Sequence, residues 1–146
     1  MSLPLLSDDA LSSAEDGFVL RLSLPWIRSL PLSSASGIRV RIDDEDVPVR
    51  VRLGGRVVSP ESLDAEAGWW FLQDRLLLHG ATRLAPGDHR VQASLTLLIP
   101  YLPGGPDRPL ILPFGSDRTL RLAPPTRSVS RDVSVSRDVS VSRDAA

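Results

Sequence analysis

Histidine, a side chain often used for acid–base and metal chemistry, is rare in this chain of 146 residues. His79 and His89 are its two histidines, and their separation does not match a metal-binding spacing such as HxH or HExxH. The acidic run at residues 43–46 lacks the alternating ligands and the glycine of a calcium-binding loop. These patterns favour surface or edge histidines and a solvated acidic turn. Cysteine is absent, which excludes disulfides and thiol catalysis.

Other signatures of catalysis are also missing. The chain has no GxSxG, P-loop or GxGxxG motif, and paired carboxylates for glycoside hydrolysis cannot be assigned from sequence. We therefore expect no catalytic residue and no metal or cofactor site on this chain. The formal net charge of -1 predicts no general attraction to nucleic acid or to acidic membranes. No apolar run reaches the ~20 residues of a membrane span and the N-terminus lacks a signal-peptide pattern, so we expect a cytoplasmic protein.

Alternating apolar residues predict the strands that would position any functional loop. Residues 17–24 place four apolar side chains on one face, which is typical of a half-buried strand. Residues 38–53 alternate on both sides of the acidic run and predict a β-hairpin, with Pro48 at a sheet edge or a bulge because proline cannot donate a ladder hydrogen bond. We interpret its arginine-rich outer face as a solvated sheet face. That face would consist of Arg39, Arg41, Arg50 and Arg52.

The rest of the chain continues the β pattern. Residues 59–68 give the single good helical signal, because Ser59 can cap, Pro60 suits the first helical position and Gly68 suits the stop. Short strands and frequent turns predict an all-β fold, an antiparallel β-sandwich of about eight strands with one short helix, and a barrel is the alternative. The predicted strands after the helix include 69–74, 75–80, a long strand ending near residue 99, 108–114 and 118–124.

Composition divides the chain into three parts. Residues 1–16 are rich in serine and acidic residues and are predicted to form an N-terminal arm, while 17–123 form the sandwich. Residues 124–146 contain three successive six-residue units that begin Ser-Val-Ser-Arg-Asp. We expect this tail to be disordered, and the alternative is a strand that adds to the edge of a partner's sheet.

Aromatic residues are the most informative candidates for a binding role. Trp69 and Trp70 are adjacent and would point to opposite faces of a strand, so both faces need covering, either by the core or by a ligand or another chain. Trp26, Ile27 and Tyr101 each lie close to a proline at the end of a predicted strand. Loops at strand ends that carry aromatic anchors commonly form binding surfaces, although core packing is the alternative for each residue.

Three segments of the chain resemble the small β subunits of bacterial C-glycoside deglycosidases. They are "GFVLRLSLPWIRSLPLS" from residue 17, "IRVRIDDEDVP" from residue 38 and "LAPGDHRVQASLTLLIPYLP" from residue 84. The resemblance runs from about residue 17 to 103, and their order and spacing make it more specific than any single segment. Two departures are Ser29 and Asp44, which stand where the family usually has glycine. Since glycine tolerates positive φ better than aspartate, Asp44 weakens the expectation of an identical turn.

The resemblance implies a function that this chain would perform as part of a complex. The family's small subunit is a β-sandwich that pairs with a larger TIM-barrel α subunit, and the α subunit holds a divalent metal, commonly Mn²⁺, and the acid–base groups. The complex cleaves the carbon–carbon bond between a 3-oxo sugar and an aromatic aglycone. We therefore expect a non-catalytic β subunit, with a free-standing carbohydrate- or ligand-binding sandwich as the alternative. The expected contacts with the α subunit are Trp26, Ile27, Arg28 and Tyr101, and Trp69 and Trp70 are expected ligand or interface aromatics.

Overall fold

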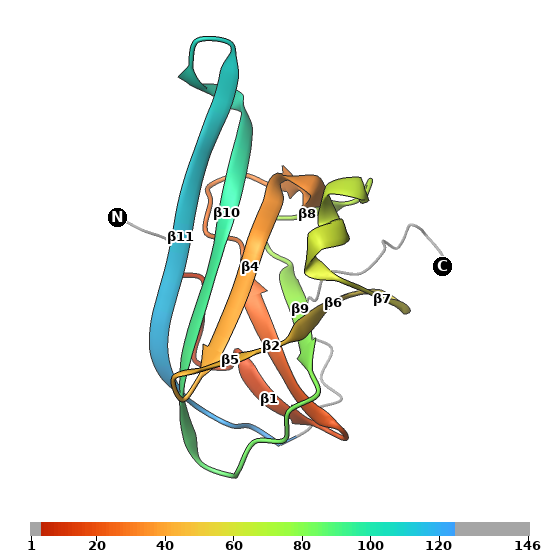
Figure 1. The fold of residues 1–146 in the computed structure, drawn as a ribbon, viewed down its shortest axis with the longest axis vertical. Helices are drawn as coiled ribbons and strands as arrows, with labels where there is room; N and C mark the ends of the chain where they lie inside the picture. The colour runs from red at the N-terminus through yellow and green to blue at the C-terminus, as the bar shows by residue number, and fades with distance from the viewer. Residues whose placement is uncertain (1–3, 125–146) are drawn as a thin grey trace.

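The computed structural model describes residues 4–124, which form an all-β protein with two short 3₁₀ helices. Eleven strands pair antiparallel in three sheets (Figure 1). The strands are β1 Leu11–Ala14, β2 Gly17–Ser23, β3 Leu30–Pro31, β4 Ala35–Ile42, β5 Glu45–Val47, β6 Val49–Leu53, β7 Arg56–Val58, β8 Trp69–Trp70, β9 Arg75–Gly80, β10 Asp88–Gly105 and β11 Arg108–Arg121.

Two larger sheets enclose a single hydrophobic core, which confirms the predicted all-β fold. One sheet has the strand order β1-β2-β9-β6-β7, the other has the order β11-β10-β4-β5, and β3 and β8 form a two-stranded sheet. The predicted alternation places side chains as expected: Phe18, Leu20 and Leu22 of β2 are fully buried. The inward residues of β10 are equally well buried, from Val91 to Ile99. Both sheets therefore contribute one apolar face to the core.

The segment 38–53 differs from the single hairpin that its sequence predicts. β4 and β5 do form a hairpin, but the chain leaves that sheet at Pro48, and β6 pairs with β9 in the other sheet. Proline stops the ladder of β5, which is an edge strand, so the chain can cross between the sheets there. The predicted arginine-rich face is consequently divided: Arg39 and Arg41 lie on the four-stranded sheet, whereas Arg50 and Arg52 lie on the five-stranded sheet.

Two further elements differ from their predictions. β11 is one continuous strand of 14 residues that spans Pro109 and Pro113, where two shorter strands were expected. It lies at the edge of its sheet, where a strand tolerates proline. The expected helix over 59–68 is a 3₁₀ helix, Pro60–Ala65, and Ser59 does not cap it with its side chain. A second 3₁₀ helix covers Leu32–Ser34.

The N-terminal residues take part in the sandwich. Leu5 and Leu6 are buried in the core, and β1 forms the edge of the five-stranded sheet beside β2. The sequence analysis assigned residues 1–16 to a separate N-terminal segment, because serine and acidic residues obscure the apolar periodicity there. The repeats expected to form a disordered tail lie outside the described residues. Among residues 4–124, no helix combines the length and the apolar character required to cross a membrane.

β10 and β11 form an arm that extends beyond the body of the sandwich (Figure 1). β10 pairs with β4 as far as Leu97, and past that residue its ladder continues with β11 alone. Register shifts follow Ile99 and Pro103, where prolines interrupt the hydrogen-bond ladder. The arm, residues 98–111, therefore carries Tyr101 away from the body on a two-stranded ribbon.

Candidate functional site

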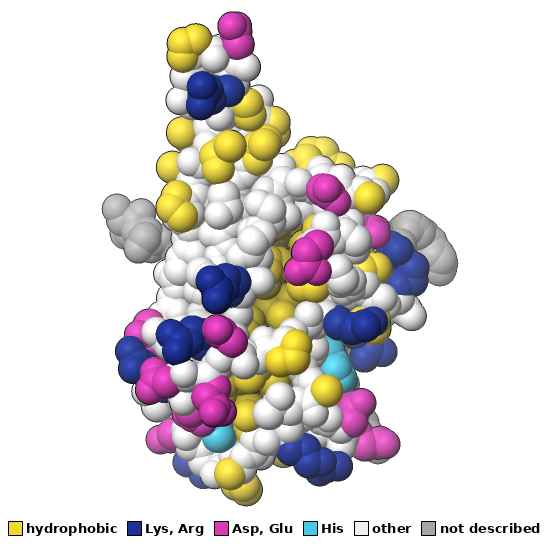
Figure 2. All heavy atoms as spheres, viewed as in Figure 1, with side chains coloured by type: hydrophobic (Ala, Val, Ile, Leu, Met, Phe, Trp, Pro, Cys, Tyr) yellow, Lys and Arg dark blue, Asp and Glu magenta, His cyan; other side chains and the backbone are white. Residues whose placement is uncertain are grey.

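Most of the exposed large apolar side chains of the described residues gather at one end of the molecule, at the base of the arm. Eight such side chains are exposed in this part of the chain, and six belong to this end. The other two are Val57 on β7 and Ile111, which lies on the face of β11 opposite to Phe114. Figure 2 shows hydrophobic atoms along the arm and at the adjoining end of the body. We call this surface the apolar end. Its six residues are Ile27, Trp69, Phe71, Leu72, Tyr101 and Leu102.

Three segments that are distant in sequence meet to form the apolar end. The loop after β2 begins at Pro25, and its residues Trp26 and Arg28 reach the arm. β3 then pairs with β8, which brings Pro31 opposite Trp69. The backbone N–H of Leu72 donates a hydrogen bond of 2.7 Å to the Oγ of Ser29. The loop at 25–29 is therefore fixed to the turn at 71–74 on one side and to the arm on the other.

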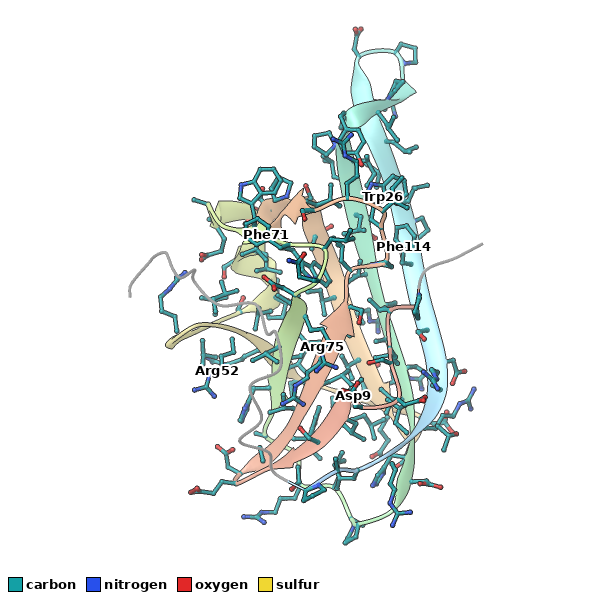
Figure 3. All side chains as sticks on the ribbon, turned by 180° about the vertical axis from the view of Figure 1, so that it is seen from behind. Asp9, Trp26, Arg52, Phe71, Arg75 and Phe114 are labelled. Carbon is teal, nitrogen blue, oxygen red and sulfur yellow. The ribbon has the colours of Figure 1, made fainter. Side chains whose placement is uncertain are left out.

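Trp26 connects the loop both to the arm and to the adjoining part of β11. Its Nε1–H donates a hydrogen bond of 2.5 Å to the hydroxyl of Tyr101. Its ring also meets Phe114 of β11 edge-to-face, with 6.4 Å between centroids and 68° between planes. Figure 3 shows these two side chains adjacent at the base of the arm. Trp26 is partly buried against the core, so it holds Tyr101 in place and also contributes to the surface.

Arg28 and Ile27 complete this part of the site. The guanidinium carbon of Arg28 lies 5.0 Å from the centroid of the Tyr101 ring, a cation–π geometry. Ile27 has the most exposed large apolar side chain of the described residues, with 67% of its surface accessible. The structure thus brings together all four residues that the sequence proposed as interface contacts. Their contact with another subunit stays a prediction.

The adjacent tryptophans have different roles. Trp70 is buried in the core, and its Nε1–H donates a hydrogen bond of 3.1 Å to the backbone carbonyl of Asp74. It is therefore placed to pack the core rather than to contact a ligand. Trp69 is 48% exposed, and Phe71 is exposed to a similar extent. The expected alternation of the two faces is confirmed, and Trp69 supplies the surface aromatic.

Sequence reasoning missed Phe71, Leu72 and Leu102 as members of this surface. Phe71 and Leu72 were assigned to a strand, whereas they follow a strand of only two residues and enter a turn. Leu102 lies between two prolines, like Ile27, and that bracketing was a signal that could have identified it.

The histidines are placed differently from each other. His79 is partly exposed, and its Nε2 lies 3.1 Å from a carboxylate oxygen of Asp16. His89 is buried, which corrects the expectation of two surface or edge histidines, because its ring lies between the loop that precedes β10 and the β4–β5 turn. Its Nδ1 lies 2.6 Å from Oδ2 of Asp43, and its Nε2 lies 2.6 Å from the carbonyl of Ala85.

The acidic run serves as a two-residue turn between β4 and β5. Ile42 pairs with Glu45, and Asp43 and Asp44 have φ values of 53° and 68°, as the central residues of a type I′ turn require. Asp43 also accepts a hydrogen bond from the backbone N–H of Arg90. The hydrogen bonds from His89 and from Arg90 lower the pKa of Asp43. Among the described residues, no group of three or more potential metal ligands occurs.

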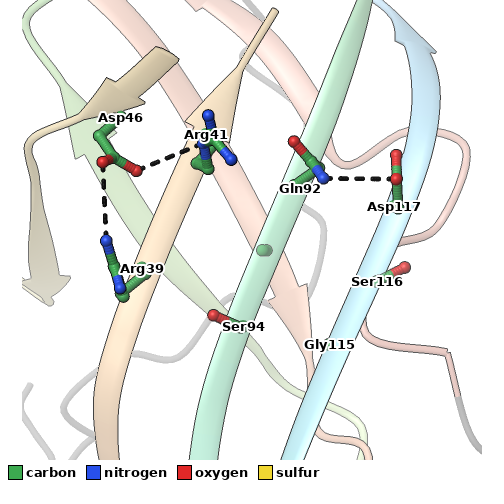
Figure 4. Close-up of a pocket in the computed structure, with 9 residues that line it drawn as sticks. Arg39, Arg41, Asp46, Gln92, Ser94, Gly115, Ser116 and Asp117 are labelled. Carbon is green, nitrogen blue, oxygen red and sulfur yellow. Dashed lines mark hydrogen bonds and ion pairs between the residues drawn. The ribbon is translucent and has the colours of Figure 1, made fainter. Parts of the chain in front are cut away.

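The outer face of the four-stranded sheet carries a polar groove of about 470 Å³ (Figure 4). Arg39 and Arg41 lie on either side of Asp46, at 3.6 and 3.5 Å, and Gln92 bonds to Asp117. Arg90 also pairs with Asp117, and this contact lowers the pKa of the aspartate. The face is therefore a network of exposed charge pairs, typical of a solvated sheet surface.

The fold and the apolar end together define an all-β sandwich that exposes several large apolar side chains at one end, a feature typical of proteins that bind a partner or a ligand. No protein-family model matches the chain. It is 34% identical over 104 residues to the 3'-dehydrocarminate deglycosidase beta subunit of a Microbacterium species, covering 68% of this chain and 79% of that protein. It is 33% identical over 88 residues to the C-glycoside deglycosidase beta subunit of Microbacterium trichothecenolyticum, covering 57% of this chain and 67% of that protein. The chain belongs to the family of C-glycoside deglycosidase beta subunits.

Proposed function

We propose that this chain is the non-catalytic β subunit of a C-glycoside deglycosidase and that it assembles with a larger, metal-dependent TIM-barrel α subunit. The observation that carries the proposal is the identity to two beta subunits of such enzymes, over most of the length of one of them. The surface chemistry supports it, because the described residues present an apolar end. The divalent metal, Mn²⁺ in our proposal, would belong to the α subunit.

The proposed reaction breaks the carbon–carbon bond between a 3-oxo sugar and an aromatic aglycone. The ketone at carbon 3 acidifies the proton on carbon 2, so a base on the α subunit can remove it. The electron pair of the former C2–H bond then forms a double bond between carbons 1 and 2. The bond between carbon 1 and the aglycone breaks, and its electron pair stays on the aglycone carbon, which takes up a proton. The name of one relative, which specifies a 3'-dehydro substrate, agrees with this substrate class.

The apolar end is the proposed docking surface for the α subunit. Its core would be Ile27 and Tyr101. Trp26 would hold the hydroxyl of Tyr101, and Arg28 would lie over the tyrosine ring. Aromatic residues and arginine are the residue types that most often dominate the binding energy of protein interfaces. Trp69 would extend the contact along the end of the body.

The test is co-expression with the candidate α subunit encoded in the same genome, with an affinity tag on one chain. We expect the two chains to purify together, and we expect the complex, but not this chain alone, to release the aglycone from a 3-oxo C-glucoside. Cleavage by this chain alone would contradict the non-catalytic role. Failure of the two chains to associate would contradict the proposed partner.

A second candidate function is a free-standing ligand-binding sandwich, favoured by the exposure of Trp69 and Phe71 on the same surface. An exposed tryptophan can stack on a sugar ring. This function predicts that C-glycosides change the tryptophan fluorescence of the isolated chain in a saturable way, and that Trp69→Ala removes the change. A flat titration would leave the β-subunit function as the better account.

A further inference from the structure

A second concave surface lies on the flank of the sandwich, away from the apolar end. The chain crosses there from one sheet to the other at Pro48, and a groove of about 650 Å³ remains between β4–β5 and β6–β9. Ile38, Val40, Val47 and Val49 supply apolar lining. In Figure 2, hydrophobic atoms are visible in a hollow at the centre of this face, with charged side chains on both sides. The groove has the size and lining of a small-molecule site.

The charged lining of this groove is balanced, with two arginines and two carboxylates, but one arginine has no ion-pair partner among the described residues. Arg50 is exposed and forms no ion pair with the described residues. Asp46 is shared between Arg39 and Arg41, so one carboxylate faces two guanidiniums (Figure 4). Glu61, the other carboxylate of the rim, already accepts a hydrogen bond from the hydroxyl of Ser59. Arg50 is therefore the lining cation that is available to pair with an anion.

We propose that this groove binds a small organic anion with an apolar body. The apolar body would lie on the valine and isoleucine floor, and Arg50 would pair with the carboxylate or sulfonate group. The groove's lining within the described part of the chain contains no phenylalanine, tyrosine or tryptophan, the side chains on which a sugar ring usually stacks. The site is separate from the proposed docking surface, and its test does not depend on the α subunit.

The probe is 8-anilinonaphthalene-1-sulfonate, which combines an apolar ring system with one negative charge, titrated into the full chain and followed by fluorescence. We expect saturable binding to one site per chain. Arg50→Glu should weaken binding at least tenfold, because it replaces the pairing cation with a repelling anion. The matched control is Arg52→Glu, which makes the same charge change two residues along β6, outside the groove lining, and should bind as the wild type does (Figure 3).

Two further variants separate this groove from other apolar surfaces. Ala81→Phe places a ring inside the groove and should abolish binding, whereas Ile27→Asp alters the apolar end and should leave binding unchanged. Circular dichroism confirms that each variant is folded. The proposal is overturned if Arg50→Glu and Ala81→Phe bind the probe as the wild type does, or if a neutral anilinonaphthalene without the sulfonate binds equally well.

Discussion

His89 is held in its charged form by two acceptors, one on each ring nitrogen. The carbonyl of Ala85 can only accept, so Nε2 carries a proton, and the carboxylate of Asp43 accepts from Nδ1. The bond to Ala85 is the main cause that raises the pKa of His89 above 6.5, and Asp43 adds to it against the opposing effect of burial. The imidazolium thus joins the β4–β5 turn to the turn before β10.

A pH dependence of stability follows from this raised pKa. The folded protein binds the proton more tightly than the unfolded chain does, so the contribution of His89 is complete below pH 6.5 and declines as the pH rises through the folded-state pKa. We expect the free energy of unfolding of the wild type, measured by urea titration, to fall in that range relative to His89→Gln. At pH 6 the variant should be less stable by about 1.5–3 kcal/mol. If the difference between the two proteins is independent of pH, the imidazolium assignment is wrong.

Trp26 contributes to the fold through Phe114 and to the surface through Tyr101, and two substitutions separate these contributions. Trp26→Phe keeps a ring against Phe114 but removes the donor to the Tyr101 hydroxyl. We expect it to weaken the complex with the proposed α subunit while stability changes by less than about 1.5 kcal/mol. Trp26→Ala should lower stability by about 1–3 kcal/mol as well. Thermal unfolding and affinity measurements check the pair, and an unchanged affinity in Trp26→Phe would make Trp26 a core residue only.

At the scale of elements, the sequence predicts strands well where one face is apolar. β2, β4 and the body of β10 follow the alternation of their residues, because burial of one face determines the register. The changes of partner could not be predicted. Alternation continues across Pro48 although β5 and β6 belong to different sheets, and β11 continues through two prolines because its outer edge needs no partner. Tertiary packing determines which strands pair with each other, and the local periodicity of a sequence carries no information about this packing.

In the candidate site, too, local features could be predicted from the sequence, whereas contacts between distant segments could not. Prolines beside Trp26, Ile27 and Tyr101 identified loops at strand ends, and these loops do meet. The contribution of Phe71 and Leu72 depends on the short pairing of β3 with β8, which joins residues about 40 positions apart in the sequence.

The contact between β2 and β9 gives a prediction for the five-stranded sheet. Phe18 pairs with Gly80, and a Cβ on that glycine would lie 2.2 Å from the buried Phe18 ring. We expect Gly80→Ala to lower the free energy of unfolding by about 1–3 kcal/mol, because the ring cannot move without disturbing the core. Gly55→Ala is the control: its Cβ would have no neighbour within 4 Å, and its stability should match the wild type. Equal denaturation midpoints for the two variants would contradict the packing described here.

At the scale of the whole molecule, the exposed apolar residues are concentrated where the arm joins the body of the sandwich. The sandwich buries its apolar faces almost completely, yet six large apolar side chains stay exposed where the arm joins the body. The cost of exposing such a surface is offset when another protein covers it. We therefore propose that the apolar end serves assembly and that the flank groove binds a small ligand.

The most direct test of this assignment compares Ile27→Asp with Val57→Asp in the affinity of the chain for the proposed α subunit. Both changes place a carboxylate at an exposed apolar position, but Val57 lies on β7, outside the apolar end. Sedimentation velocity of the mixed subunits should show that Ile27→Asp weakens the complex at least tenfold and that Val57→Asp assembles as the wild type does. Wild-type assembly of Ile27→Asp, or equal weakening in both variants, would contradict docking through the apolar end.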